Sequence, residues 1–260
     1  MKIPRIGLTG ATSALGEIVL DSLLEIPKAS IVAFGRRRIR NSKIAFIQWS
    51  LGEDPGGADF DFFFHLAFDR RNLSLSSAGT IRIVRQIAQQ SPSCQQVLFS
   101  SISSFRDTKS QYGAAKHLVE SQLSLTLANL IIVRPGILME PHGMGRGFLR
   151  AVAFSPVLPK DIQLLNIRTV SRKQISDMVN KIVVRDYREG EINLCGPDAF
   201  CEAEISRFRR FPWIGIPMKI FVRSVEVALR LMPSKLILRD QLCAMLANRH
   251  SPYCNPGEEK

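Results

Sequence analysis

The residues best suited to chemistry in this sequence are a tyrosine and a lysine four positions apart, Tyr112 and Lys116. They open a stretch with helical spacing, and on a helix this separation places both side chains on one face. An ammonium group close to a phenol lowers the pKa of the phenol, which then serves as a general acid or base toward a substrate oxygen. The pair predicts proton transfer; the alternative is an amphipathic helix that carries both residues by chance.

A second motif lies at the start of the chain, where an apolar run ends in a turn of small residues and a helical pattern follows at once. In such a strand–turn–helix unit, glycine lets the backbone approach a pyrophosphate, and the helix N-terminus supplies partial positive charge. We expect a dinucleotide to bind here; the alternative is an ordinary turn without a ligand. The predicted contact residues are Gly10, Thr12, Ser13, Ala14, Leu15 and Gly16.

Three arginines follow the second strand-like run, at residues 36–38. In a dinucleotide-binding fold this position lies beside the adenosine ribose, where an acidic residue accepts from the 2′-hydroxyl of NAD and an arginine pairs with the 2′-phosphate of NADP. Residues 29–38 contain no Asp or Glu. Arg36 and Arg37 therefore predict NADP, with NADPH preferred over NADH; the alternative is a basic loop that touches no ligand.

The other apolar segments supply the elements that must position these motifs. Strands are predicted at residues 3–8, 29–34, 43–48, 62–67, 96–99 and 128–133, and helices at residues 14–25, 78–89 and 112–123. Residues 51–59 hold several glycines and a proline and predict a loop, so a helix before the fourth strand is expected to be shortened or missing. The alternation predicts an α/β fold with a doubly wound parallel sheet of the Rossmann type.

Together the motifs resemble the short-chain dehydrogenase/reductase superfamily, especially its extended and atypical branches, over roughly residues 3 to 200. Ser13 departs from the family's Thr-Gly-x-x-Gly-x-x-Gly turn, because it replaces the middle glycine. Its Cβ would crowd the pyrophosphate although its hydroxyl could donate to it, so weaker binding is expected rather than none. Further matching segments are Asp61 with His65-Leu66-Ala67, Arg134-Pro135-Gly136 and, more faintly, residues 191–197.

The resemblance implies roles for individual residues. Ser101, the second serine after the fifth strand, would orient the substrate oxygen beside Tyr112 and Lys116, with Ser103 in reserve. Tyr112 and Lys116 would also hold the nicotinamide ribose. Leu66 and Ala67 would pack near the adenine and its ribose, and Pro135 and Ile137 near the nicotinamide. His65 is expected to be a packed strand residue rather than a ligand. Arg168 is nearest the family position that reaches a substrate diphosphate; the alternative is a solvated surface arginine.

The implied activity is that of an NADP(H)-dependent oxidoreductase with a Ser-Tyr-Lys triad, acting on a nucleotide sugar as a 4-keto reductase or epimerase. Residues 100–105 carry no acidic residue, which argues against the 4,6-dehydratases of the family. The alternative is an NADPH-binding accessory or sensor protein with little turnover, a class that the atypical branch includes.

The composition of the chain limits the partners and the cellular compartment that we expect. The chain has 260 residues with a formal net charge of +12, which favours anionic partners; the alternative is a solvated basic surface. Nucleic acid is not expected, because no basic run alternates with aromatic residues. The five cysteines are scattered and show no zinc spacing, so we expect free thiols in a cytoplasmic protein and no metal site.

The C-terminal part is expected to form a small, mostly helical substrate region at residues 141–260, interleaved with a dinucleotide-binding core at residues 1–140. Residues 214–232 predict an amphipathic helix with a mainly basic stripe. This helix either packs on the domain or contacts a membrane surface. A homodimer is also expected by analogy with the family.

Overall fold

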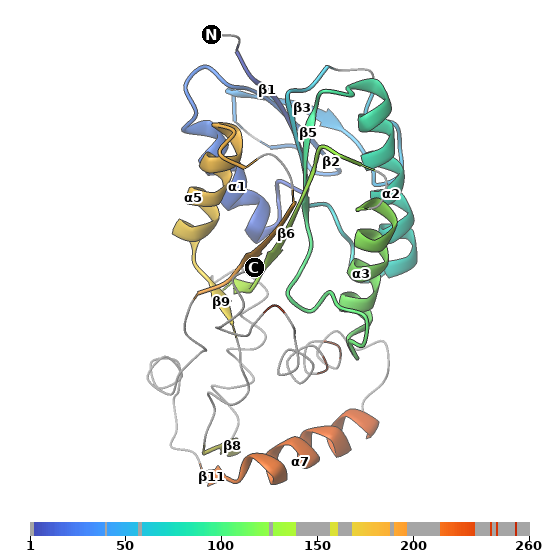
Figure 1. The fold of residues 1–260 in the computed structure, drawn as a ribbon, viewed down its shortest axis with the longest axis vertical. Coiled ribbons are helices and arrows are strands. Elements are labelled where there is room, and N and C mark those ends of the chain that lie inside the picture. The colour runs from blue at the N-terminus through green and yellow to red at the C-terminus, as the bar shows by residue number, and fades with distance from the viewer. Residues whose placement is uncertain are drawn as a thin grey trace. The chain divides into compact units, whose positions relative to one another are not determined.

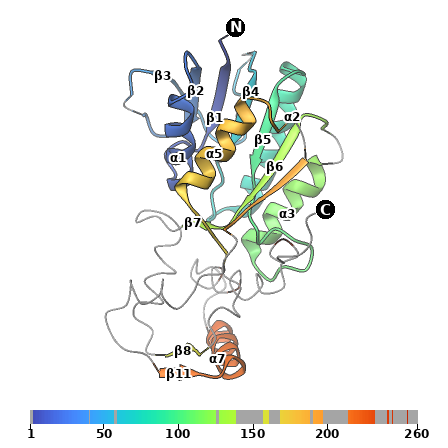
Figure 2. The same ribbon diagram turned by 60° about the vertical axis from the view of Figure 1, so that its left-hand side comes forward.

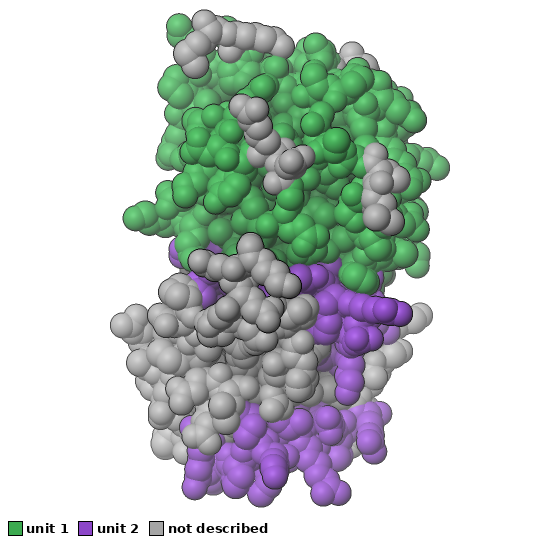
Figure 3. Space-filling model, viewed as in Figure 1, with its two compact units in different colours: residues 1–101, 115–134, 172–194 green, residues 102–114, 135–171, 195–260 purple. Residues whose placement is uncertain are grey.

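The computed structural model describes residues 3–39, 41–56, 59–124, 127–138, 157–160, 168–187, 190–196 and 214–231, together with Asp240, Cys243 and Tyr253. Residues 139–156, 161–167 and 197–213, which hold much of the predicted substrate region, lie outside this set. The chain forms two compact units that alternate along the sequence (Figure 3). Unit 1 contains residues 1–101, 115–134 and 172–194, and unit 2 contains residues 102–114, 135–171 and 195–260.

Unit 1 is built on a seven-stranded sheet in the order β10-β6-β5-β4-β1-β2-β3. β1 pairs in parallel with β2 on one side and with β4 on the other, and parallel pairing continues to β3 and through β5 to β6. The order reverses between β1 and β4, where Thr9 lies opposite His65. Ligands of doubly wound sheets bind in the crevice at this reversal, beyond the carboxyl ends of the strands. The strands are β1 (Arg5–Thr9), β2 (Ser30–Gly35), β3 (Ile44–Gln48), β4 (Phe62–His65), β5 (Gln95–Phe99), β6 (Leu130–Pro135) and β10 (Gly190–Leu194).

Two helical layers cover the sheet (Figures 1 and 2). Helices α1 (Ala14–Leu24) and α5 (Arg172–Val183) lie side by side on one face, and α2 (Leu73–Gln90) and α3 (Gln111–Leu123) cover the other. A hydrogen bond of 2.8 Å between the hydroxyls of Ser22 and Ser176 ties α1 to α5. These layers confirm the predicted α/β fold of the Rossmann type and account for the apolar strands, because both faces are buried.

The core beneath α2 is unusually aromatic. Phe34, Phe60 and Phe63 come from three neighbouring segments and pack with ring centroids 5.2–6.0 Å apart. Gly7 is required beneath them, since a Cβ at this position would lie 2.3 Å from the ring of Phe63. Aromatic pairs at these distances contribute attraction beyond the area that they bury.

Unit 2 contains small sheets and one long helix among its described residues. β7 (Ile137–Leu138) pairs in parallel with β9 (Thr169–Val170), and β8 (Val157–Pro159) pairs in parallel with β11 (Ile214–Ile216). Helix α7 (Met218–Leu231) follows β11 directly. No helix in the described part of the chain is long and apolar enough to cross a membrane.

The structure corrects several predicted boundaries. α2 begins five residues earlier than predicted, because Asn72 caps it by accepting from the Leu75 amide at 3.2 Å. The helix predicted at residues 214–232 starts only at Met218: the first residues form β11, and Pro217 intervenes. Between β3 and β4 the described residues form no helix, which agrees with the loop predicted there.

Candidate functional site

A cavity of about 480 Å³ opens at the sheet reversal, within unit 1. Seven residues predicted to hold a dinucleotide line it: Gly10, Thr12, Ser13, Arg36, Arg37, Leu66 and Ala67. They come from the turn after β1, the end of β2 and the segment after β4, which are far apart in sequence. Parallel strands bring these three carboxyl ends to one edge, so the sheet order itself assembles the site.

The turn after β1 and the first turn of α1 each leave no room for a side chain at one glycine. Gly10 has a φ of 73°, and a Cβ there would lie 2.6 Å from the amide nitrogen of Ala67. A Cβ on Gly16 would lie 2.1 Å from the carbonyl oxygen of Gly10. The hydroxyl of Thr9 accepts hydrogen bonds from the amides of Leu66 and Ala67 at 3.1 and 3.2 Å, which fixes the turn against the end of β4.

Ser13 is the N-cap of α1. Its hydroxyl oxygen accepts from the Gly16 amide at 3.0 Å and its hydroxyl donates to the carbonyl oxygen of Gly10 at 2.9 Å. The hydroxyl proton is therefore used within the turn, which differs from the expectation that it could serve a pyrophosphate. Ala14, Leu15 and Gly16 are not among the described residues that line the cavity; they form the first turn of α1.

The side of the cavity beside the end of β2 has a wall that the sequence did not predict. Trp49 is buried against Phe34, and its indole N–H donates to the carbonyl oxygen of Glu53 at 3.0 Å. The carboxylate of Glu53 accepts from the Ser50 amide at 2.7 Å, so residues 49–53 form a closed turn. Trp49, Ser50 and Leu51 line the cavity where the chain lacks a helix, while Arg36 and Arg37 are exposed at its rim. The glycines and the proline of residues 51–59 predicted a loop, but they did not indicate that this part of the chain lines the cavity.

Tyr112 and Lys116 lie one turn apart on α3, as their spacing predicts. Lys116 is only 3% exposed: its ammonium donates to the carbonyl oxygen of Phe99 at 2.7 Å and lies 4.0 Å from the ring centroid of Phe68. Phe68 also lines the cavity, so Lys116 stands directly behind one of its walls. The half-buried Tyr112 lies in the first turn of α3.

The first turn of α3 is capped from the far end of the chain. One carboxylate oxygen of Asp240 accepts from the amides of Gln111 at 2.7 Å and Tyr112 at 3.4 Å. Asp240 also accepts from the Ser110 hydroxyl at 3.1 Å, and that hydroxyl accepts from the Gly113 amide at 3.0 Å. A carboxylate at a helix N-terminus satisfies free amides and interacts favourably with the helix dipole. No local pattern pointed to Asp240.

Five other predicted residues lie outside the lining of this cavity. Ser101 is half-buried directly after β5, and Ser103 is buried. Pro135 ends β6 and Ile137 begins β7. Arg168 is 7% exposed, and its carbonyl oxygen accepts from the Ile137 amide at 2.8 Å.

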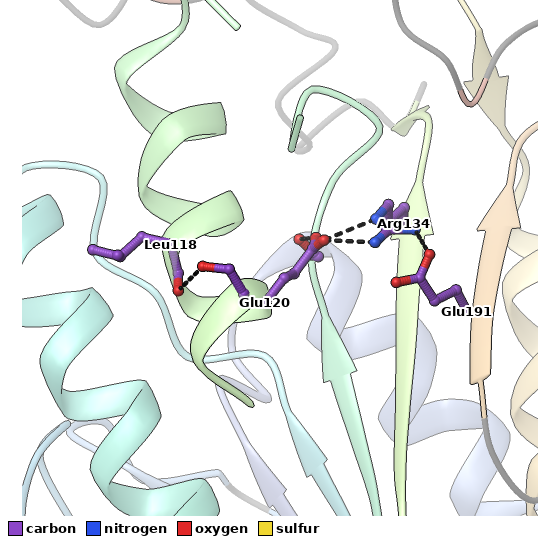
Figure 4. Close-up of polar contacts among 6 residues, drawn as sticks. Leu118, Glu120, Arg134 and Glu191 are labelled. Atoms are coloured by element: carbon purple, nitrogen blue, oxygen red, sulfur yellow. Dashed lines mark hydrogen bonds and ion pairs between the residues drawn. The ribbon is translucent and has the colours of Figure 1, made fainter. Parts of the chain in front are cut away.

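A buried ion pair holds α3 to the sheet (Figure 4). The guanidinium of Arg134 on β6 donates to one carboxylate oxygen of Glu120 at 3.0 and 2.6 Å, and to Glu191 of β10 at 2.5 Å. The Ser100 hydroxyl donates to the other oxygen of Glu120. The side chains of Arg134 and Glu120 are 3% and 4% exposed. The hydrogen bond from Arg134 lowers the pKa of Glu191, and burial opposes that shift. Ser100 therefore belongs to this cluster, and Ser101 stays the serine that is predicted to orient a substrate oxygen.

His65 is packed in β4, as predicted. The Gln96 amide N–H donates to the Val84 carbonyl oxygen at 3.1 Å, so the Gln96 carbonyl accepts from Nε2 of His65, 2.8 Å away. The other ring nitrogen, Nδ1, is buried without a hydrogen-bond partner in the structure. Burial lowers the pKa of His65 to about 4; the bond to Gln96 opposes this shift and the Lys116 ammonium adds to it. The imidazole therefore stays neutral beside the lysine.

The comparisons agree with this geometry. No protein-family model matches the sequence, and no curated protein matches it. Among solved structures, a nucleoside-diphosphate-sugar epimerase from Staphylococcus aureus is similar with a TM-score of 0.71 and 14% identity, over 98% of this chain and 92% of that one. The terminal reductase domain of the myxalamid biosynthetic pathway is similar with a TM-score of 0.69 and 15% identity, over 95% of this chain and 79% of that one.

A third similar structure is the UDP-N-acetylglucosamine 4-epimerase from Bacillus cereus, with a TM-score of 0.56 and 17% identity over 78% of this chain and 79% of that one. The chain therefore shares the fold of these epimerases and of this terminal domain, an α/β fold of the Rossmann type.

Replacing Arg134 with methionine should destabilise the protein by about 3–5 kcal/mol, because it leaves the Glu120 carboxylate buried without a cation. Adding Glu120→Gln should recover part of that loss. The matched control is Arg172→Met, which breaks an ion pair with Asp21 whose side chains are 50% and 62% exposed; it should cost about 0–1 kcal/mol. Urea unfolding measures all of these variants, and equal losses for Arg134→Met and Arg172→Met would contradict the prediction.

The stability of the protein should fall between neutral pH and pH 5 because of His65. An unfolded histidine titrates near pH 6.5, whereas the folded pKa of His65 is about 4. Between these values only the unfolded state takes up the proton, so stability is full above about pH 6.5 and falls as the pH drops. The expected loss between pH 7.5 and pH 5 is about 2 kcal/mol. His65→Gln should lose that much less over the same range, measured by urea unfolding; parallel pH curves would show that His65 is not responsible.

Proposed function

We propose that this chain is an NADPH-dependent oxidoreductase that acts on a nucleotide-linked sugar as a 4-keto reductase or epimerase. The observation that carries the proposal is the cavity at the sheet reversal, which joins the turn after β1 to a rim with two arginines. The residues fit a dinucleotide. Gly10 and Gly16 allow the close backbone packing that holds the N-terminus of α1 beside the cavity, where its amides would face a pyrophosphate, and Arg36 and Arg37 provide positive charge for a 2′-phosphate.

The second cofactor half would lie toward α3. The cofactor supplies the hydride that is exchanged with a substrate carbon. Tyr112 would hold or deliver the proton at the substrate oxygen, and Ser101 would donate a hydrogen bond to the same oxygen. Lys116, anchored by Phe99 and Phe68, would place a fixed positive charge one helical turn from Tyr112. Pro135 and Ile137 would border the nicotinamide, with Leu66 and Ala67 near the adenine.

Several neighbours support the substrate class. One is a UDP-N-acetylglucosamine 4-epimerase, one a UDP-galactose 4-epimerase, and one was solved in complex with UDP-glucose and NAD. UDP-sugars are therefore the first substrates to test. We infer that the reaction takes place in the cytoplasm.

A second candidate function is an NADPH-binding accessory or sensor protein with little turnover. The burial of Lys116 favours it, because an ammonium that donates to a backbone carbonyl and lies against an aromatic ring also serves as a structural anchor. The two candidates share the cofactor site and differ in what Tyr112 does.

Replacing Arg36 and Arg37 with alanine should weaken NADPH binding by about 1–3 kcal/mol, because charge-assisted contacts to the 2′-phosphate are lost. NADH binding should change much less. Arg38→Ala is the matched control, since Arg38 is equally exposed but does not line the cavity. Fluorescence titration with both cofactors measures the effect. Equal weakening for NADPH and NADH would exclude the assignment to the 2′-phosphate, and no saturable binding of either would exclude the proposed function.

Tyr112→Phe should abolish turnover because it removes the phenolic hydroxyl that transfers the proton. NADPH binding should stay within a few-fold of wild type, because the aromatic ring remains. The assay follows the oxidation of NADPH with a UDP-4-keto sugar, and the epimerisation of UDP-glucose and UDP-N-acetylglucosamine. Gln111→Ala is the control on the same helical turn, and it should retain activity. If wild type and Tyr112→Phe bind NADPH equally and neither turns over any of these substrates, the accessory or sensor function is the better description.

A further inference from the structure

Helix α7 carries two aliphatic side chains that are about half exposed to solvent. Ile220 is 55% exposed and Val227 is 49% exposed. They are seven residues apart and therefore lie on one face of the helix, two turns from each other. The side of α7 away from these two residues is partly buried, and its half-buried residues are Met218, Phe221, Val222 and Val225.

A row of cations runs beside this aliphatic pair. Lys219, Arg223 and Arg230 are all exposed, and their spacings of four and seven residues place them in one row along α7. At 3.6 residues per turn, this row lies about 70° around the helix from the aliphatic pair. The acidic residue of the helix, Glu226, falls on the opposite side of the row from Ile220 and Val227.

We propose that α7 binds the surface of an anionic membrane, with its axis parallel to the lipid plane. Helices that lie in the headgroup region place aliphatic side chains at the acyl boundary and Lys or Arg beside them, where the long side chains reach the phosphates. With 14 residues α7 is too short to cross a bilayer. The formal net charge of +12 adds a long-range attraction to such a surface.

The composition of this face fits lipid better than a protein partner. Protein interfaces are centred on aromatic or arginine anchors in fully desolvated pockets, and lysine is depleted there. On the described exposed face of α7 the apolar residues are aliphatic and only partly covered, and lysine and arginine stand directly beside them. This inference does not depend on the proposed reaction, since it concerns residues outside the cofactor cavity.

The test is sedimentation of the full chain with vesicles of phosphatidylcholine alone and with vesicles containing 30% phosphatidylserine. Wild type should sediment only with the anionic vesicles. Lys219→Glu/Arg223→Glu should weaken this binding on the order of 25-fold or more, because each cation near an anionic surface contributes about a factor of five. The matched control Lys173→Glu/Lys181→Glu changes the net charge equally at exposed positions of α5, and it should weaken binding only a few-fold.

The aliphatic contribution is tested separately. Ile220→Ser/Val227→Ser should weaken binding to the anionic vesicles about ten-fold and make the remainder more sensitive to salt. Its control is Ile3→Ser/Val184→Ser, which removes aliphatic side chains that are 54% and 67% exposed in unit 1. Far-UV circular dichroism and thermal melting verify that each variant is folded. If Lys219→Glu/Arg223→Glu is not folded, Lys219→Gln/Arg223→Gln replaces it and should still weaken binding about 25-fold. If Ile220→Ser/Val227→Ser is not folded, Ile220→Ala/Val227→Ala replaces it and should still weaken binding several-fold.

Three results would overturn the proposal: no sedimentation of wild type with anionic vesicles, equal binding to both kinds of vesicle, or equal losses in the α7 variants and their controls. The last result would assign the binding to the overall charge. Measuring NADPH binding on the same preparations keeps the two proposals apart, since the α7 variants should bind NADPH as wild type does.

Discussion

The close approach of backbone to backbone at the turn after β1 is the constraint on which the site depends. Gly10 is packed against the Ala67 amide and Gly16 against the Gly10 carbonyl oxygen, at distances that exclude a Cβ. The Thr9 hydroxyl accepts from two amides that follow β4. These contacts bring the N-terminus of α1 to the point where the sheet order reverses. The partial positive charge of that helix end and the space for a phosphate therefore coincide. Ser13 lines the cavity, and its hydroxyl closes the turn by donating to the Gly10 carbonyl oxygen and accepting from the Gly16 amide.

Helix α3 depends on a different kind of interaction. A buried pair of charges rarely adds much to stability compared with apolar residues, but removing one partner is strongly destabilising. The Arg134–Glu120 pair therefore sets the position of α3 on β6 more than it adds to the free energy of unfolding. Glu120 follows Lys116 by one turn, so the contact that fixes Glu120 against β6 also fixes the height and rotation of the lysine. Lys116 makes its own contact with Phe99, and α3 is thus tied to the ends of two neighbouring strands, β5 and β6.

Local signals predicted most of the sheet, the turn after β1, and the Tyr112–Lys116 pair, because each is encoded within a few consecutive residues. The prediction was wrong where one residue with a local preference decided a boundary: Asn72 extends α2 by capping it, and Pro217 delays α7. Contacts between distant segments were missed for another reason. The positions of Trp49 beside the cavity and of Asp240 at the first turn of α3 are set by tertiary structure, which no periodicity in the sequence reports. The roles of all the predicted site residues, Ser101, Pro135 and Ile137 among them, stay predictions.

The basic residues of this chain act in environments that differ in exposure, and exposure decides what each charge can do. Lys116 and Arg134 are withdrawn from water, so their charges act over short distances on fixed partners and are little screened by salt. Arg36 and Arg37 are exposed at the cavity rim, where a charge adds affinity only when a ligand phosphate comes within hydrogen-bond distance. The cations of α7 have neither a buried partner nor a cavity, and exposed charges of this kind matter mainly toward an extended surface of opposite sign. The net charge of +12 therefore arises from basic residues with different roles. The buried cations maintain the fold, the arginines at the rim are the ones that we propose select the cofactor, and only the remaining cations are available for another anionic partner.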